Sequence, residues 1–143
     1  MKFIALLLLF VIPTQWEPDF ENAKKIAKEK HELILLNFSG SDWCGPCIVM
    51  HKDYIGSEAF QDMAKGNLVM VNADFPRKKK NQLPADQVKR NDALAEKYNK
   101  NGQFPLTLLL DADGNVLKTW SGKPEASVAQ WTEEVKAICN SHK

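Results

Sequence analysis

The sequence predicts an α/β protein with a mixed sheet flanked by helices. Segments with helical periodicity alternate with short apolar runs of strand length, and a tight turn joins the last two runs. Such alternation favours parallel strands, and the late hairpin adds an antiparallel one. The chain has 143 residues, which suits one domain with one sizeable core. Its 26% of charged residues is ordinary for a globular protein and argues against disorder.

The first half of the chain begins with an amphipathic pattern. Phe20, Ala23 and Ala27 recur at three- and four-residue spacing and predict a helix. The following apolar run suits a strand covered on both faces. The predicted elements are a helix over residues 19–30, a strand over 33–38, a helix from about 44 to past 50, a short helix over 58–65 and a strand over 68–73.

The second half opens with a polar, basic stretch over residues 76–85. Asn101-Gly102 is a typical stop signal for the helix before it, and the turn at residues 111–114 has hairpin composition. The predicted elements are a helix over residues 91–99, strands over 106–110 and 116–120, and a last helix from about Pro124.

The N-terminus indicates export. Lys2 precedes the unbroken apolar run 3–12, which is too short to span a bilayer and has the length of a secretory h-region. We expect residues 1–14 to be a signal peptide and residues 15–143 to be the domain, in the periplasm or secreted. An uncleaved anchor or a buried N-terminal strand remains the alternative. Without Lys2 the charges balance, so we expect neither nucleic acid nor an anionic membrane as a partner.

Three cysteines, Cys44, Cys47 and Cys139, indicate a protein that uses a thiol pair. A small secreted scaffold held together by disulfides would have more cysteines, in an even number. Cys139 lies beside the apolar stripe of the last predicted helix, so we expect a half-buried, inert thiol.

Cys44 and Cys47 stand at the predicted start of a helix, three residues apart, which places their sulfurs within disulfide reach. Unpaired N–H groups there stabilise a thiolate on Cys44 and make it the attacking sulfur. Cys47, one turn deeper, would resolve the mixed disulfide. Pro46 is tolerated in a first helical turn and stiffens the loop. The spacing also fits half a zinc site, for which His51 is the nearest third ligand.

The run Trp43-Cys44-Gly45-Pro46-Cys47 resembles the active site of the thioredoxin family. Phe104-Pro105-Leu106-Thr107 is similar to the family's cis-proline loop, and the order of elements from Asp19 onward matches as well. The predicted signal peptide and the run Gly40-Ser41-Asp42 before Trp43 make the chain most similar to exported bacterial members of the family. The resemblance implies a thioredoxin-like fold, a cis Pro105 against the cysteines, and substrate binding by Phe104. It implies no metal and no cofactor other than the Cys44–Cys47 disulfide.

Two positions depart from the family pattern. The buried Asp that assists the second cysteine corresponds to Asn37, which cannot accept a proton, and Met70 replaces a lysine of the following strand. We therefore expect water or a substrate group to take the proton of Cys47. Asp42 either shapes substrate entry or raises the pKa of the thiolate, and Trp43 is expected to pack beside the site.

Gly45-Pro46 between the cysteines resembles the reducing members of the family. We therefore expect a monomeric thiol–disulfide oxidoreductase that reduces exported proteins and takes electrons from a membrane or periplasmic donor. An oxidase or isomerase of the same fold is the first alternative, since about 30 mV in potential corresponds to only about 1.4 kcal/mol. A non-enzymatic module that binds a metal or a client protein is the second. The basic run 77–80 is expected to be a solvated loop.

Overall fold

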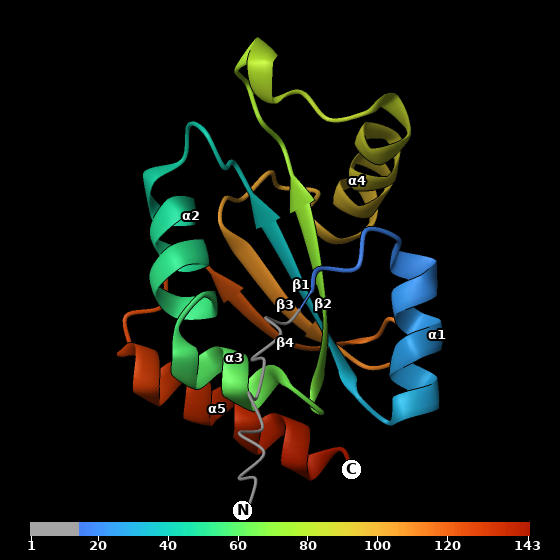
Figure 1. Ribbon diagram of the computed structural model, residues 1–143, viewed down its shortest axis with the longest axis vertical. Helices are drawn as coiled ribbons and strands as arrows, with labels where there is room; N and C mark the ends of the chain where they lie inside the picture. The colour runs from blue at the N-terminus through green and yellow to red at the C-terminus, as the bar shows by residue number, and fades with distance from the viewer. Residues whose placement is uncertain (1–14) are drawn as a thin grey trace, which may run out of the picture.

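The computed structural model describes residues 15–143, and its centre is a four-stranded mixed sheet (Figure 1). The spatial order is β2-β1-β3-β4. β1 (Leu33–Ser39) runs parallel to β2 (Leu68–Asp74) and antiparallel to β3 (Leu106–Leu110), and β4 (Val116–Ser121) closes the hairpin with β3. Every residue of β1 and β3 is buried, which explains their unbroken apolar runs.

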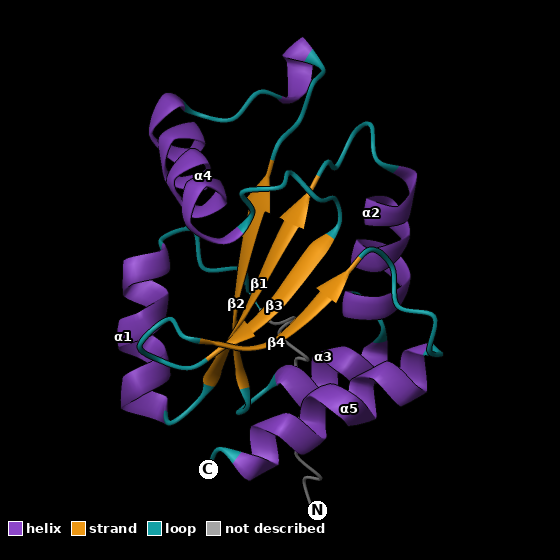
Figure 2. Ribbon diagram, turned by 180° about the vertical axis from the view of Figure 1, so that it is seen from behind, coloured by secondary structure: helices purple, strands orange, loops and turns teal. Residues whose placement is uncertain are grey.

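Helices cover both faces of the sheet (Figure 2). One face carries α1 (Phe20–Lys30) and α4 (Ala85–Tyr98). The other carries α2 (Gly45–Val49), α3 (Glu58–Ala64) and α5 (Val128–Ser141). Each face has its own apolar core, with Trp131 at the centre of one and Phe38 in the other. This arrangement confirms the predicted α/β class and mixed sheet.

The helix bounds differ from the sequence prediction at three places. α4 begins at Ala85 and not at 91, because its first turns are polar and carry no apolar periodicity that would reveal them. α5 begins at Val128, after a capping box between Ser127 and Gln130 that the sequence prediction did not use. The helix that follows the cysteines continues from α2 into a π-helical segment, η1 (Met50–Ile55), which ends at Gly56.

Residues 75–84, which hold all but the last residue of the predicted basic stretch, form a loop between β2 and α4, which we call the basic loop. It contains a single 3₁₀ turn, η2 (Lys79–Asn81). In Figure 1 it rises above the carboxyl end of β2, next to the loop that leads into α2. No helix within residues 15–143 is both long and apolar enough to cross a bilayer. The signal peptide predicted for residues 1–14 lies outside the described residues.

Candidate active site

Three segments that are distant in sequence meet at one edge of the sheet. β1 and β2 are parallel, so their carboxyl ends, Ser39 and Asp74, are register partners. β3 is antiparallel to β1, so its amino end lies at the same edge, where Leu106 pairs with Phe38. The loop before α2, the start of the basic loop and the segment before β3 therefore converge, and the cysteines lie among them.

Cys44 and Cys47 form a disulfide with their Cα atoms 5.2 Å apart. Cys44 is the N-cap of α2, and its sulfur accepts a hydrogen bond from the backbone N–H of Cys47 at 3.3 Å. Pro46 occupies the first turn, where no backbone N–H is needed. Cys44 is 6% exposed and Cys47 is fully buried. The structure thus places Cys44, Gly45, Pro46 and Cys47 at the start of a helix, as the sequence predicts, and Cys44 is the less deeply buried of the two cysteines.

The loop before α2 is fixed by hydrogen bonds to the end of β2. Ser41 donates from its hydroxyl and its backbone N–H to the Asp74 carboxylate, at 2.6 and 3.0 Å. The backbone N–H of Cys44 donates to the Gly40 carbonyl at 2.9 Å. Gly40 has no room for a side chain, because a Cβ atom there would overlap the indole of Trp43. These contacts hold the approach to Cys44 in one conformation.

Trp43 packs beside the site in an aromatic cluster with Phe104 and Phe75. Its ring contacts Phe104 edge-on at 5.4 Å between centroids, and Phe104 contacts Phe75 in the same way at 5.6 Å. The indole N–H of Trp43 donates to the Phe75 carbonyl at 2.8 Å. The cluster thus connects the loop before α2, the basic loop and the segment before β3.

The peptide bond between Phe104 and Pro105 is cis, as the resemblance implies. Pro105 is buried, and its carbonyl accepts from the Gly122 N–H at 2.9 Å. Within residues 15–143 the backbone N–H and C=O of Phe104 have no hydrogen-bond partner. Those two groups are therefore free to pair with an extended segment of another protein.

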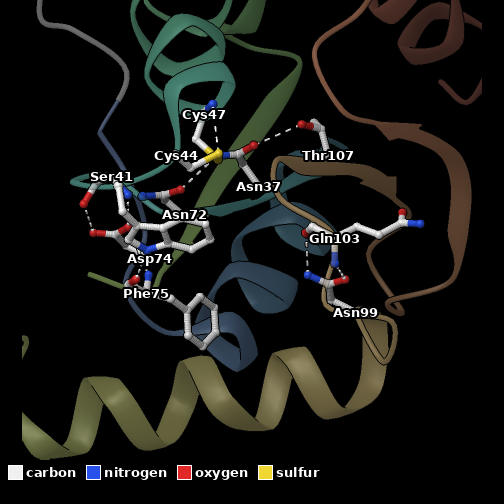
Figure 3. Close-up of a disulfide and its surroundings, with 11 residues drawn as sticks. Asn37, Ser41, Cys44, Cys47, Asn72, Asp74, Phe75, Asn99, Gln103 and Thr107 are labelled. Carbon is white, nitrogen blue, oxygen red and sulfur yellow. Dashed lines mark hydrogen bonds between the residues drawn. A yellow bond between two sulfur atoms is a disulfide. The ribbon is translucent and has the colours of Figure 1, made fainter. Parts of the chain in front are cut away.

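Asn37 lies in a row of uncharged polar side chains across the sheet (Figure 3). It is 1% exposed, donates to the Asn72 side-chain oxygen at 3.0 Å, and accepts from the Thr107 hydroxyl at 3.0 Å. Both ends of its amide are thus satisfied, and none of the three side chains can take up a proton at neutral pH. Asn72, and not the buried Met70, is the β2 residue paired with Asn37.

A small pocket of about 150 Å³ lies beside Cys47. Its lining includes the Asn72 amide and the exposed side chains of His51 and Lys52. The His51 ring also stacks on Trp16, with 5.5 Å between centroids. The pocket has room for a water molecule beside Cys47, and several of its lining side chains are polar.

The Asp42 carboxylate holds the basic loop. It accepts from the backbone N–H groups of Arg77 and Lys78, each at 2.9 Å, and from the Asn81 side chain at 3.0 Å. These hydrogen bonds, led by the one from Arg77, lower the pKa of Asp42 to about 2. Asp42 is therefore ionised at any physiological pH.

Cys139 takes no part in the site. It lies on α5 with 3% of its surface exposed, and burial raises the pKa of its thiol to about 11. The thiol is thus more deeply buried than the predicted half-buried one. Within residues 15–143 no three side chains of His, Cys, Asp or Glu are grouped so that they could hold a metal ion.

Sequence reasoning missed Asn72, Thr107 as a partner of Asn37, and Phe75. Asn72 carried a usable signal, because it is polar within an otherwise apolar strand. Phe75 carried none, since its contact with Phe104 depends on which strands are neighbours in the sheet.

Comparisons with known proteins agree with this geometry. A family model described as thioredoxin-like matches residues 15–112. The disulfide bond reductase DsbH of Chlamydia pneumoniae is 36% identical over 123 residues, covering 86% of this chain and 71% of that protein. The thioredoxin-related protein DsbJ of the same organism is 31% identical over 96 residues, which are 66% of this chain but only 26% of DsbJ.

Solved structures show the same fold. A structure of a DsbH oxidoreductase superposes with a TM-score of 0.78 at 35% identity, covering 90% of this chain and 86% of that one. A thioredoxin from Thermus thermophilus superposes with a TM-score of 0.67 at 13% identity, covering 92% and 91%, and shows the fold alone. Together with the cysteine pair at the start of α2 and the cis Pro105, these matches show that the chain belongs to the thioredoxin-like family.

Proposed function

We propose that this thiol–disulfide oxidoreductase reduces disulfides in proteins outside the cytoplasm. The observation that carries the proposal is the Cys44–Cys47 disulfide at the start of a helix, where the Cys44 sulfur accepts a hydrogen bond from the Cys47 N–H. The similarity to a protein named as a disulfide bond reductase supports the reducing direction. The disulfide itself is the only redox group that the reaction needs.

The reaction proceeds in two exchanges. The Cys44 thiolate attacks one sulfur of a substrate disulfide, a bond forms between the two sulfurs, and the second substrate sulfur leaves as a thiolate with the electron pair. Cys47 then loses its proton and attacks Cys44, which releases the first substrate sulfur. The substrate gains two electrons, and the enzyme is left with the Cys44–Cys47 disulfide. A membrane or periplasmic donor of electrons restores the dithiol.

The substrate lies against the aromatic cluster and the cis-proline loop in this proposal. An extended substrate segment pairs with the free backbone groups of Phe104. Trp43 and Pro105 position that segment over Cys44. The proton of Cys47 passes to water in the adjacent pocket, because Asn37 has no capacity to accept it.

Export belongs to the same proposal. The apolar run at residues 3–12 after Lys2 supports a secretory signal over residues 1–14. A reductase in an oxidising compartment needs continuous resupply of electrons, which is why a dedicated donor is part of the proposed function.

Redox titration tests the proposal. The protein is equilibrated in dithiothreitol or glutathione buffers, its thiols are alkylated, and the wild type is compared with Cys44→Ser. A reversible two-electron transition at a strongly reducing potential, absent from Cys44→Ser, is expected. A much higher potential would instead indicate an oxidase or isomerase. The lack of any transition that depends on Cys44 would leave the metal- or client-binding module.

A further inference from the structure

The basic loop carries four consecutive cations, Arg77, Lys78, Lys79 and Lys80. All four residues are exposed. Within residues 15–143 none of them lies within ion-pair distance of a carboxylate, whereas six other lysine and arginine side chains do. Without Lys2 the charges of the chain balance only when these four cations are counted, so they form a local positive patch on a domain without net charge.

Hydrogen bonds hold the loop that presents these cations in a defined conformation. Asp42 fixes it through the backbone N–H groups of Arg77 and Lys78, and the Gln82 side chain bonds back to the Pro76 and Lys78 carbonyls at 3.0 and 3.3 Å. The hydrogen bonds of Asp42 occupy main-chain groups of the loop and the Asn81 amide. The lysine side chains thus remain available to a partner while their backbone is held in place.

The loop is also joined to the active site. The Arg77 guanidinium lies over the Trp43 ring, 3.7 Å from its centroid, which is a close cation–π contact. Trp43 directly precedes Cys44 and contacts Phe104. The basic loop therefore adjoins the aromatic cluster, and it lies at the same end of the sheet as the loop that leads into α2 (Figure 1).

From this arrangement we propose that residues 77–80 select substrate proteins with acidic residues beside the reactive disulfide. The inference rests on the proposed function and names its substrate class. A substrate segment over Phe104 and Trp43 continues toward the basic loop, where its carboxylates meet the free lysine ammonium groups. Complementary charge of this kind raises the rate of encounter more than it raises final affinity.

The test uses the Cys47→Ala variant, which traps the first exchange and makes the result independent of reaction direction. The Cys44 thiolate attacks a disulfide-linked peptide, the peptide's second sulfur leaves as a thiolate, and the mixed disulfide accumulates. Two peptides are compared that differ only in having two Glu or two Gln beside the attacked cysteine. The rate of mixed-disulfide formation is measured by mass spectrometry at low salt and at about 0.15 M salt.

Lys79→Glu/Lys80→Glu is the informative variant, because neither side chain contacts Asp42 or Trp43. Lys25→Glu/Lys30→Glu is the matched control, because both lysines are exposed on α1, lie outside the ion pairs of residues 15–143 and give the same change in net charge. We expect a preference of about tenfold for the Glu peptide at low salt, which weakens at higher salt. The control variant retains this preference, and the Lys79→Glu/Lys80→Glu variant loses it.

Equal rates for the two peptides, or a preference that survives in Lys79→Glu/Lys80→Glu, would overturn the inference. Loss of binding to phosphatidylserine vesicles in that variant, with the peptide preference intact, would also overturn it and assign the loop to a membrane surface. Absence of a mixed disulfide with either peptide would overturn the proposed function and the inference with it. A high redox potential with the preference intact would contradict the reducing direction alone.

Discussion

Asn37 is a buried amide at the position where a carboxylate would supply a proton acceptor for Cys47. In Asn37→Asp the ionised carboxylate cannot donate to the Asn72 oxygen whereas the protonated carboxyl can, and both this loss and burial raise the pKa of the new group. The unfolded chain then ionises before the folded one, so stability falls as the pH rises. In urea unfolding, we expect Asn37→Asp to lower the free energy of unfolding relative to wild type at both pH values. The decrease should be about 1–3 kcal/mol larger at about pH 8 than at about pH 4.

Thr107→Val is the control for this prediction. It removes the hydroxyl that donates to Asn37 without adding a titrating group. Its loss of stability should be the same at both pH values. An equal loss for Asn37→Asp at the two pH values would contradict the account of a buried, uncharged row.

Cys139 also predicts a loss of stability with rising pH, in this case in the alkaline range. Burial raises the pKa of its thiol from 9.0 to about 11, so the unfolded state releases the proton first. The stability that the neutral thiol contributes is therefore present below pH 9 and is lost as the pH rises toward 11. The wild type should lose stability relative to Cys139→Ala across that range in denaturant unfolding. Rapid maleimide labelling of native Cys139 at neutral pH would contradict its burial.

At the scale of the element, Asp42 determines the conformation of the basic loop. In Asp42→Ala the backbone N–H groups of Arg77 and Lys78 lose their acceptor, and the loop should open. We expect faster trypsin cleavage within residues 77–80 and faster hydrogen exchange at both amides, while the exchange of α5 is unchanged. Cleavage as slow as in wild type would show that Gln82 holds the loop unaided.

The same hydrogen bonds predict how the loop responds to acid. The pKa of Asp42 is depressed to about 2 from 3.8, so the stabilisation is present above 3.8 and is lost as the pH falls toward 2. Hydrogen exchange of the Arg77 and Lys78 amides, corrected for intrinsic rates, should therefore rise only in strong acid. Opening already at about pH 5 would contradict this assignment.

The elements differ in how far the sequence predicts them. β1 and β3 are buried on both faces, and such apolar runs are visible from the sequence alone. The first turns of α4 are polar and exposed, and its N-cap is Pro84, which makes no side-chain cap hydrogen bond. The π-helical segment after α2 depends on Gly56, where a Cβ would lie 2.6 Å from the Lys52 carbonyl oxygen. Because no periodicity in the sequence indicates that contact, the π-helical segment could not be predicted from the sequence.

At the scale of the whole molecule, Trp131 holds one of the two cores together. It is fully buried, stacks on Phe60 at 4.8 Å, and meets Tyr54 and Trp120 edge-on. Trp131→Ala should cost about 3–5 kcal/mol of unfolding free energy through the cavity that it leaves. Its indole N–H has no hydrogen-bond partner within residues 15–143, so Trp131→Phe should cost much less. Equal costs in guanidinium unfolding would show that packing around the ring is not the source of its contribution.

The sequence predicts those parts of the candidate active site whose residues are close together in the chain. It does not predict the residues that the order of strands in the sheet brings to the site. The Cys44–Cys47 spacing and Pro46 predict the start of a helix from only four consecutive residues. Asn72 and Phe75 join the site only because β2 lies beside β1 and ends at the same edge. Sequence alone does not reveal such neighbours, so the sequence analysis named no partner for Asn37, which the strand pairing places beside Asn72.

Asp42 binds the basic loop through the backbone N–H groups of residues 77 and 78. The conformation of the loop therefore does not depend on most of the loop's side chains. Mutations at residues 78–80 can therefore accumulate without altering the scaffold, as long as Asp42, the Asn81 amide and an unblocked backbone are retained. The loop is thus a place where descendants of one ancestral protein can diverge in charge while inheriting the same catalytic centre. Relatives with this Asp and a differently charged loop would be the evolutionary record of that freedom.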